Sequence, residues 1–246
     1  MGAVILHGLF GMGRNWATIA KALSKTRRVL TLDLRNHGAS PWDNAMDYPI
    51  MAGDVAKLIE AQFDGAVAVI GHSMGGKTAM TLACERPNLV ERLCVVDIAP
   101  ASYDHAFDAH LDAMAEMDTK ALARRTDAET IIANAIDDRP VAQFLSRNLK
   151  PADDGHGFEW QINVAAIAAN INEILGFPAT QINQAYDSPT LFLLGGASNH
   201  VQSFHMGEIE RLFPNAMTEV ISDAGHWLHV EKPTEVTTAL RVFLDS

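Results

Sequence analysis

Short apolar runs alternate with amphipathic stretches through the first part of the chain. Four runs are predicted strands: AVIL (3–6), VLTLDL (29–34), AVAVI (66–70) and LCVVD (93–97). Three stretches between them repeat apolar side chains at helical spacing: 15–25, 48–63 and a segment from about Met74 to just before Pro87. Strands that alternate with helices predict an α/β fold, with a mostly parallel sheet and helices on both of its faces.

The alternation stops after Ala99 and resumes near Asp187. The segment between carries helical patterns with no convincing strand among them: AHLDAMAEM, RPVAQFLSRNL and INVAAIAANINEIL. The α/β pattern then returns with a strand at 189–196, a helix around 203–213, a strand at 216–222 and a helix from about Thr234. We therefore expect a core formed by residues 1–101 and 187–246, and a helical insertion at 102–186.

Composition narrows the class of protein. The chain has 246 residues, which fits one domain with an insertion, and a formal net charge of -11. This acidity argues against nucleic acid and anionic membrane as main partners.

Cys84 and Cys94 form neither a CxxC pair nor a metal-ligand cluster, so buried thiols in a reduced compartment are the simplest account. We see no secretory signal and no apolar run of the ~18 residues that span a membrane, so we expect a cytoplasmic protein. The sequence indicates no oligomeric state.

The stretch GHSMGGKT (71–78) follows the predicted strand AVAVI and matches two motifs of different chemistry. As G-x-x-x-x-G-K-[ST] it is a phosphate-binding loop, in which Lys77 and Thr78 hold a nucleotide and Asp97 helps to hold magnesium. As G-x-S-x-G it is a nucleophile elbow, which exposes Ser73 on a sharp turn. Both motifs lie between a strand and a helix, so these residues alone leave the two alternatives open.

Three other stretches favour the nucleophile elbow: HGLFG (7–11), DLRNHGAS (33–40) and DAGHWLHVEKP (223–233). HGLFG directly follows a strand, where a serine hydrolase needs a backbone N–H for its oxyanion hole. The expected donors are the N–H groups of Met74 and of Leu9, with Phe10 as the less favoured alternative to Leu9. DAGHWLHVEKP carries His226 on a turn after the last strand, where a catalytic base is required. Nucleotide binding explains none of the three stretches.

The combination HGLFG, DLRNHGAS, GHSMGGK, VVDIAP and AGHWLHVEKP resembles the α/β-hydrolase superfamily and, within it, the YbfF-type esterases. The resemblance runs nearly end to end and implies an α/β-hydrolase fold in which residues 102–186 form a helical cap. Most members have two antiparallel strands before the HG loop. This chain reaches that loop at His7, so we expect a sheet without those two strands.

The resemblance also implies the activity. It predicts a serine carboxylic-ester hydrolase that acts on small acyl esters through an acyl-enzyme, with acyl thioesters such as acyl-CoA as further substrates and with no cofactor or metal. One alternative is a nucleotide-binding protein that uses Lys77, Thr78 and Asp97. Others are a cofactor-free enzyme of the same fold with another reaction, such as a perhydrolase or C–C hydrolase, and a protein that only binds a ligand. In a hydrolase, Lys77 is expected to be a surface or helix-packing lysine.

The catalytic roles follow from the motif positions. Ser73 would be the nucleophile, with Gly71 and Gly75 relieving crowding at the strained turn. His226 would be the general base, and His229 is the alternative three residues further on. Three more histidines match motif positions that shape loops in the family, and support roles are expected for them: His7, His37 and His72.

The acid of the triad is the least obvious member. Most proteins of this fold place it after the strand equivalent to LFLLGG, but here that position holds Ser198, whose replacement by alanine should be nearly silent. Asp97 ends the strand after the nucleophile helix, and the resemblance to the YbfF type supports it as the acid. We favour Asp97 over the other candidates, which look like loop and turn residues: Asp33, Asp187 and Asp223.

The substrate pocket is expected under the cap. Phe10, Phe144 and Trp160 are the predicted substrate-binding residues. Three further apolar side chains of the insertion could line an acyl pocket or simply pack the cap: Phe107, Met114 and Ile167. A mainly apolar entrance predicts a hydrophobic acyl group, of a length that the sequence does not specify.

Overall fold

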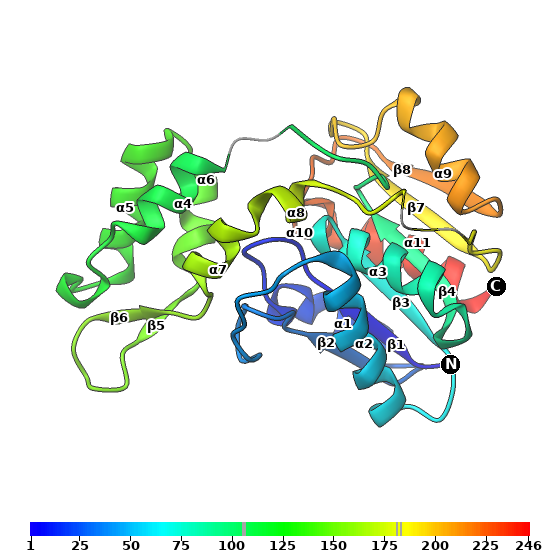
Figure 1. The fold of residues 1–246 in the computed structure, drawn as a ribbon, viewed down its shortest axis with the longest axis horizontal. Coiled ribbons are helices and arrows are strands. Elements are labelled where there is room, and N and C mark those ends of the chain that lie inside the picture. Colours follow the sequence, from blue (N-terminus) through cyan, green and yellow to red (C-terminus); the bar gives the residue numbers. More distant parts are fainter. Residues whose placement is uncertain (105–106, 181, 183) are drawn as a thin grey trace.

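A six-stranded parallel sheet forms the centre of the molecule (Figure 1). The computed structural model describes residues 1–104, 107–180, 182 and 184–246. The strands are β1 (Ala3–Leu6), β2 (Val29–Leu32), β3 (Val67–His72), β4 (Val90–Val96), β7 (Thr190–Gly195) and β8 (Ala216–Ile221), in the order β2-β1-β3-β4-β7-β8. Each lies within a few residues of a predicted strand, so the prediction of an α/β fold with a parallel sheet is confirmed.

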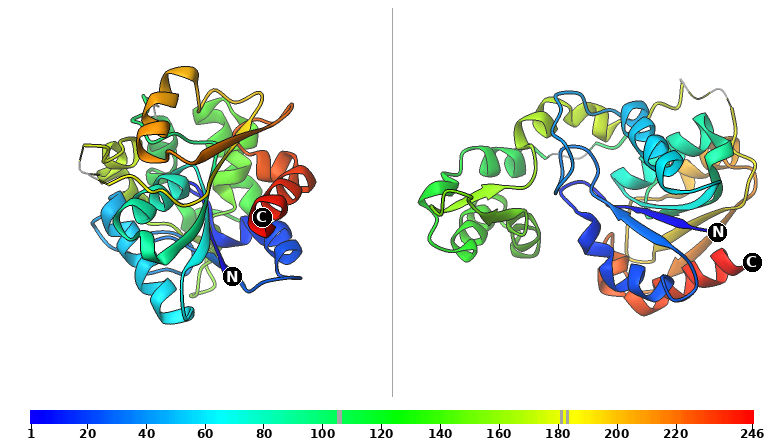
Figure 2. Two further views of the ribbon diagram at one scale, coloured as in Figure 1. Left: turned by 90° about the vertical axis from the view of Figure 1, so that its right-hand side faces the viewer. Right: turned by 90° about the horizontal axis from the view of Figure 1, so that it is seen from below.

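Helices cover both faces of this sheet, because successive side chains of a buried strand point to opposite faces. Val4 and Leu6 of β1 join the apolar core under α2 (Tyr48–Gln62), α3 (Met74–Glu85) and α9 (Met206–Leu212). Ala3 and Ile5 join a second core under α1 (Ala17–Leu23) and α11 (Pro233–Asp245), on the other face. Figure 2 shows the two layers of helices with the sheet between them.

One helix of this core, α2, begins at a side-chain cap. Asp47 accepts a hydrogen bond from the Ile50 N–H at 2.8 Å and starts α2, and Pro49 in the first turn has no N–H to satisfy. Shorter helical turns complete the core: η1 (Gly13–Trp16), η2 (Pro87–Leu89), η4 (Ser203–His205) and α10 (Leu228–Glu231). In the described part of the chain, no helix is both long enough and apolar enough to cross a membrane.

The segment between β4 and β7 forms a separate lobe beyond the carboxyl ends of the strands (Figures 1 and 2). Its elements are α4 (Asp108–Ala115), η3 (Thr119–Ala121), α5 (Arg125–Ile136), α6 (Arg139–Ser146), β5 (Leu149–Pro151), β6 (Phe158–Trp160), α7 (Val164–Ala169) and α8 (Ile171–Leu175). We propose that this lobe is the cap, with the boundaries 102–186 expected from the sequence.

One expectation about the lobe is wrong, because it contains strands. β5 and β6 form a small antiparallel hairpin in which Leu149 pairs with Trp160. Gly155 and Gly157 in the connecting turn have φ angles of +78° and +68°, which glycine adopts without strain. Strands of three residues are too short to show a period-two pattern, so hydrophobic periodicity does not predict them.

Candidate active site

Ser73 lies on the sharp turn between β3 and α3. Its φ and ψ angles are 52° and -120°, a conformation that only the surrounding structure can enforce on a residue with a side chain. The Ser73 N–H donates to the carbonyl oxygen of Val96 at 3.1 Å, which ties the turn to β4. A Cβ on Gly71 would lie 2.2 Å from the Gly75 carbonyl oxygen, and one on Gly75 would lie 2.5 Å from the His7 carbonyl oxygen. Both glycines are therefore required for the turn, as the nucleophile-elbow motif predicts.

Asp97 follows β4 and is only 1% exposed. Its Oδ1 accepts a hydrogen bond from the Gly195 N–H at 2.9 Å, and its Oδ2 lies 2.8 Å from Nδ1 of His226. The Ser198 hydroxyl donates to the same Oδ2 at 2.5 Å. Burial raises the pKa of Asp97, and the hydrogen bonds from Ser198 and Gly195 oppose that rise. Ser198 thus contacts the predicted acid, Asp97, directly, and the expectation that its replacement would be nearly silent needs revision.

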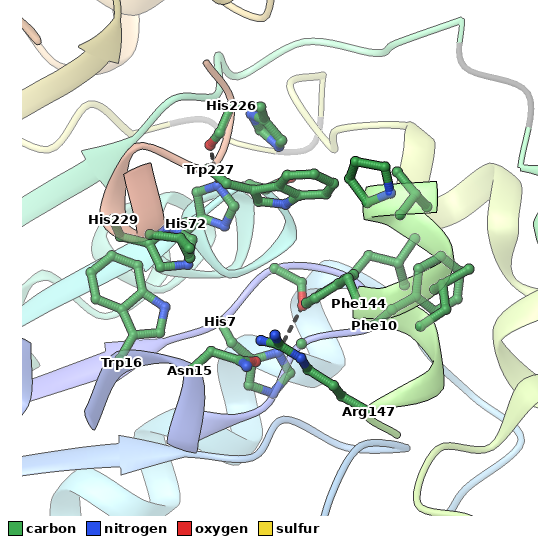
Figure 3. Close-up of a pocket in the computed structure, with 18 of the residues that line it drawn as sticks. His7, Phe10, Asn15, Trp16, His72, Phe144, Arg147, His226, Trp227 and His229 are labelled. Carbon is green, nitrogen blue, oxygen red and sulfur yellow. Dashed lines mark hydrogen bonds between the residues drawn. The ribbon is translucent and has the colours of Figure 1, made fainter. Parts of the chain in front are cut away.

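His226 lies in the turn between β8 and α10, next to this carboxylate. An Nδ1–H that donates to Asp97 fixes the tautomer and leaves Nε2 as the basic nitrogen of the neutral ring. Nε2 of His72 donates to the carbonyl oxygen of His226 at 2.8 Å, which holds the turn (Figure 3). Burial, followed by the neighbouring His226, holds the pKa of His72 well below its ordinary value, so His72 is a neutral support.

Two other buried histidines hold the HGLFG loop. Nε2 of His7 accepts from the Leu34 N–H at 2.9 Å, and Nε2 of His37 accepts from the Phe10 N–H at 3.2 Å. Burial lowers the pKa of His7 to about 4 and that of His37 to about 3, so both rings are neutral and can accept. Asp33 holds an adjoining loop, because its Oδ1 accepts from the Gly13 N–H at 2.8 Å.

These contacts distinguish the two candidate oxyanion donors of the loop. The Phe10 N–H is already bound to His37, whereas the N–H groups of Leu9 and Met74 have no acceptor within the described residues. Met74 is the first residue of α3, and the first N–H groups of a helix have no partner inside the helix. Leu9, Ser73 and Met74 line one small pocket, so the predicted pair of donors borders Ser73, the predicted nucleophile.

That pocket has a volume of about 580 Å³ and opens between the core and the cap. Ser73 and His226 line it, together with the predicted substrate-binding residues Phe10 and Phe144 (Figure 3). A smaller pocket of about 100 Å³ adjoins it, and Leu9, Ser73 and His226 line both. Phe107 also lines both pockets.

The structure does not bring Trp160 to either pocket. Its indole N–H donates to the Met114 carbonyl oxygen at 3.2 Å, and its ring packs inside the cap. Met114 and Ile167 are 1% and 0% exposed and also pack the cap. Trp227 lines the pocket and was not predicted, although it directly follows His226 in the AGHWLH motif.

Lys77 is buried and does not reach toward the mouth of the turn. Its Nζ donates to the carbonyl oxygens of Leu175 and Gly176, at 2.8 and 2.6 Å, at the end of α8. Burial lowers its pKa to about 7. The Thr78 hydroxyl donates to the Met74 carbonyl oxygen at 3.0 Å. The two residues that would hold a nucleotide are thus engaged elsewhere. Of the two expected environments for Lys77, surface or helix-packing, the structure shows the helix-packing one.

His200 is a further histidine that lies close to Asp97 and His226. The ring of His200 stacks on that of His226, with centroids 3.5 Å apart and planes inclined by 12°. One ligand atom each from Asp97, His200 and His226 lies within 4.8 Å of the others, which is a spacing that a metal ion could use. A metal ion lies in the plane of each imidazole ring that binds it. The rings of His200 and His226 are stacked and nearly parallel, so no nearby position lies in both ring planes. The cluster therefore fits a hydrogen-bonded triad better than a metal centre, and the absence of a metal stays a prediction.

The fold and this geometry define the class, and comparison with known proteins agrees. The family model described as alpha/beta hydrolase fold matches residues 4–233. The chain therefore belongs to the α/β-hydrolase fold family, as its motifs predicted.

Similar proteins include esterases and lipases. The chain is 42% identical to the sn-1-specific diacylglycerol lipase ABHD11 of Danio rerio over 98% of this chain and 77% of that protein. It is 36% identical to the esterase YbfF of Escherichia coli (strain K12), over 98% of this chain and 92% of that protein. Among solved structures, a marine microorganism esterase superposes with a TM-score of 0.94 at 36% identity, covering 99% of this chain and 95% of that one. The prediction of a carboxylic-ester hydrolase that resembles the YbfF-type esterases is confirmed at the level of this class.

Proposed function

We propose that this chain is a serine carboxylic-ester hydrolase with Ser73 as nucleophile, His226 as general base and Asp97 as acid. The observation that carries the proposal is the 2.8 Å contact between Asp97 Oδ2 and His226 Nδ1. It lies beside a serine with positive φ that lines the same pocket as His226. A buried carboxylate, an oriented imidazole and a hydroxyl that lines the pocket are the three parts that acyl transfer through serine requires.

The geometry supports the following sequence of steps. Nε2 of His226 takes the proton of Ser73, whose Oγ attacks the carbonyl carbon of the ester. The N–H groups of Leu9 and Met74 stabilise the resulting oxyanion. His226 then protonates the leaving alcohol, and the acyl group remains on Ser73. Water attacks this acyl-enzyme in the second half of the reaction, with the same groups in the same roles, and releases the carboxylic acid.

The substrate is a small-molecule acyl ester with an apolar acyl group, because Phe10, Phe107 and Phe144 line the pocket. Acyl thioesters, including acyl-CoA, pass through the same kind of tetrahedral intermediate and belong to the proposal as further substrates. The names of the relatives as esterases and lipases support ester cleavage over a perhydrolase or C–C hydrolase reaction. Cys84 and Cys94 are both buried free thiols, which supports the proposed cytoplasmic location.

The first test is labelling with a fluorophosphonate, followed by intact-mass spectrometry. The unchanged protein should gain one stoichiometric adduct, and Ser73→Ala should gain none. Ser203→Ala is the matched control, since Ser203 is an exposed serine outside the pocket, and it should label fully. Hydrolysis of p-nitrophenyl butyrate should be lost in parallel with labelling.

A folded protein that gains no adduct would contradict an activated serine. Labelling that persists in Ser73→Ala would place the nucleophile elsewhere. If labelling is specific but esters are not hydrolysed, the triad stands and the proposed reaction does not.

A further inference from the structure

Two unsatisfied polar atoms lie together in the lining of the large pocket, and a third, His110 Nδ1, lies apart from them on α4. Trp16 Nε1 and His229 Nδ1 are buried and have no hydrogen-bond partner among the described residues. Both residues line the pocket, and their rings stack with centroids 4.4 Å apart and planes inclined by 3°. A buried polar group without a partner is costly, so such groups persist where a ligand or an ordered water completes them. In Figure 3 the nitrogen-bearing edge of the Trp16 ring faces the pocket.

A row of rings connects this end of the pocket to the catalytic base. The ring centroid of His72 lies 4.7 Å from that of His226, and the centroid of His229 lies 4.6 Å from that of His72. Trp16 completes the row behind His229. His226 must protonate the oxygen of the leaving alcohol, so the alcohol part of the substrate lies beside His226. The row therefore extends from the reacting oxygen along the side that the alcohol part occupies.

The opposite side of the pocket has a different character. Phe10 and Phe144 lie away from Trp16 (Figure 3) and supply apolar surface, which suits an acyl chain. The ring of His110 lies against Phe107, which in turn packs on Phe10. The end near Trp16 is instead rich in hydrogen-bond donors, because Asn15 and Arg147 also line it (Figure 3). The pocket is thus divided into an apolar side and a donor-rich side, with Ser73 on its wall.

We propose that Trp16 and His229 form a subsite that binds an oxygen atom of the alcohol part of the substrate. The subsite would select esters of polyols over esters of simple alkyl alcohols. The indole N–H supplies a donor for a hydroxyl or carbonyl oxygen. Burial, followed by the neighbouring His72, holds the pKa of His229 well below its ordinary value, so its ring is neutral and suits an uncharged partner. This inference rests on the proposed ester hydrolysis and names its substrate class.

The test compares two esters that share one acyl group and one carbon skeleton. 1-Monobutyrin and n-propyl butyrate differ only in two hydroxyl groups on the alcohol part. We expect kcat/KM to be higher for 1-monobutyrin in the unchanged protein. Trp16→Phe keeps an aromatic ring beside His229 but removes the N–H donor together with the five-membered ring. Lost packing should affect both esters alike, so the variant should lower the ratio of the two kcat/KM values by roughly three- to tenfold, the effect of one lost hydrogen bond. A general loss of activity cancels in this ratio.

Trp160→Phe is the matched control, because Trp160 donates its N–H inside the cap, and the ratio should not change. His229→Phe is the second variant, which decides the matter if Trp16→Phe does not fold, and it should lower the ratio in the same way. An unchanged ratio in a folded variant would overturn the subsite and would indicate an enclosed water instead. Fluorophosphonate labelling of Ser73 in the same samples separates that outcome from a failure of the proposed function.

Discussion

The buried histidines of the oxyanion loop make the stability of this protein depend on pH. His37 is 0% exposed, and burial lowers its pKa from 6.5 to about 3. Between these values the unfolded chain holds a proton that the folded chain lacks, so the free energy of unfolding falls as the pH falls. Above about pH 6.5 the neutral His37 ring does not lower the free energy of unfolding. As the pH drops from about 6.5 toward about 3, protonation of His37 in the unfolded chain lowers that free energy by roughly 5 kcal/mol in total. His7, with a pKa of about 4, acts in the same direction and adds roughly 3 kcal/mol. Together they are comparable to the whole stability of an ordinary domain.

The test replaces His37 with glutamine, whose amide oxygen can still accept from the Phe10 N–H but does not titrate. Urea unfolding followed by circular dichroism at several pH values between about 4.5 and 6 gives the slope of the unfolding free energy against pH. His37→Gln should reduce that slope by about 1.4 kcal/mol per pH unit, the linkage for one proton. His156→Gln is the control, because His156 is exposed in the turn between β5 and β6. Equal slopes for the two variants would refute the argument that His37 is neutral because it is buried.

Two further predictions concern the acid and the buried lysine. Asp97→Asn should lower kcat on p-nitrophenyl butyrate by about 10⁴ and leave the urea midpoint unchanged. Ser198→Ala should lower kcat by roughly tenfold, because its hydroxyl orients Oδ2 of Asp97. If the Asn variant kept most of its activity, Asp97 would not belong to the proposed triad. Lys77→Met should leave two carbonyl groups at the end of α8 without their donor and lower Tm by roughly 5–10 °C, measured by calorimetry. The exposed Lys57→Met is its control, and an equal Tm for the two variants would contradict the role of Lys77 as a clamp.

Much of the core could be predicted because its signals are local. Most strands of the sheet are short apolar runs, and the motifs lie after the carboxyl ends of strands. β8 is the exception, because it contains Thr218 and Glu219 and is largely exposed. The turn at Ser73 and the turn at His226 each carry glycine in a recognisable pattern. Parallel strands bring their carboxyl ends to one edge, so these separate motifs were bound to meet there.

The features that could not be predicted depend on residues distant in the chain. Lys77 is buried because α8 returns over it, and nothing near Lys77 in sequence indicates that. Trp16 fits the helical spacing of a core residue and is one, being 1% exposed, yet it also stacks on His229 at the other end of the chain. Trp160 was expected in the pocket because it is a large aromatic residue of the cap, but the cap needs a core of its own.

The position of Asp97, the proposed acid, shows that sheet topology allows the acid of a triad to come from either of two loops. β4 and β7 are neighbours in the sheet, with Val96 in register with Leu193, so the loops that follow them lie side by side. A side chain from either loop can reach Nδ1 of His226, and here Asp97 does so from the end of β4. Ser198, on the loop after β7, supplies a hydroxyl to the same carboxylate oxygen. The loop that does not carry the proposed acid therefore helps to hold it. This arrangement requires only that the two strands be adjacent and parallel, so a motif search centred on the loop after β7 alone would miss Asp97, the proposed acid.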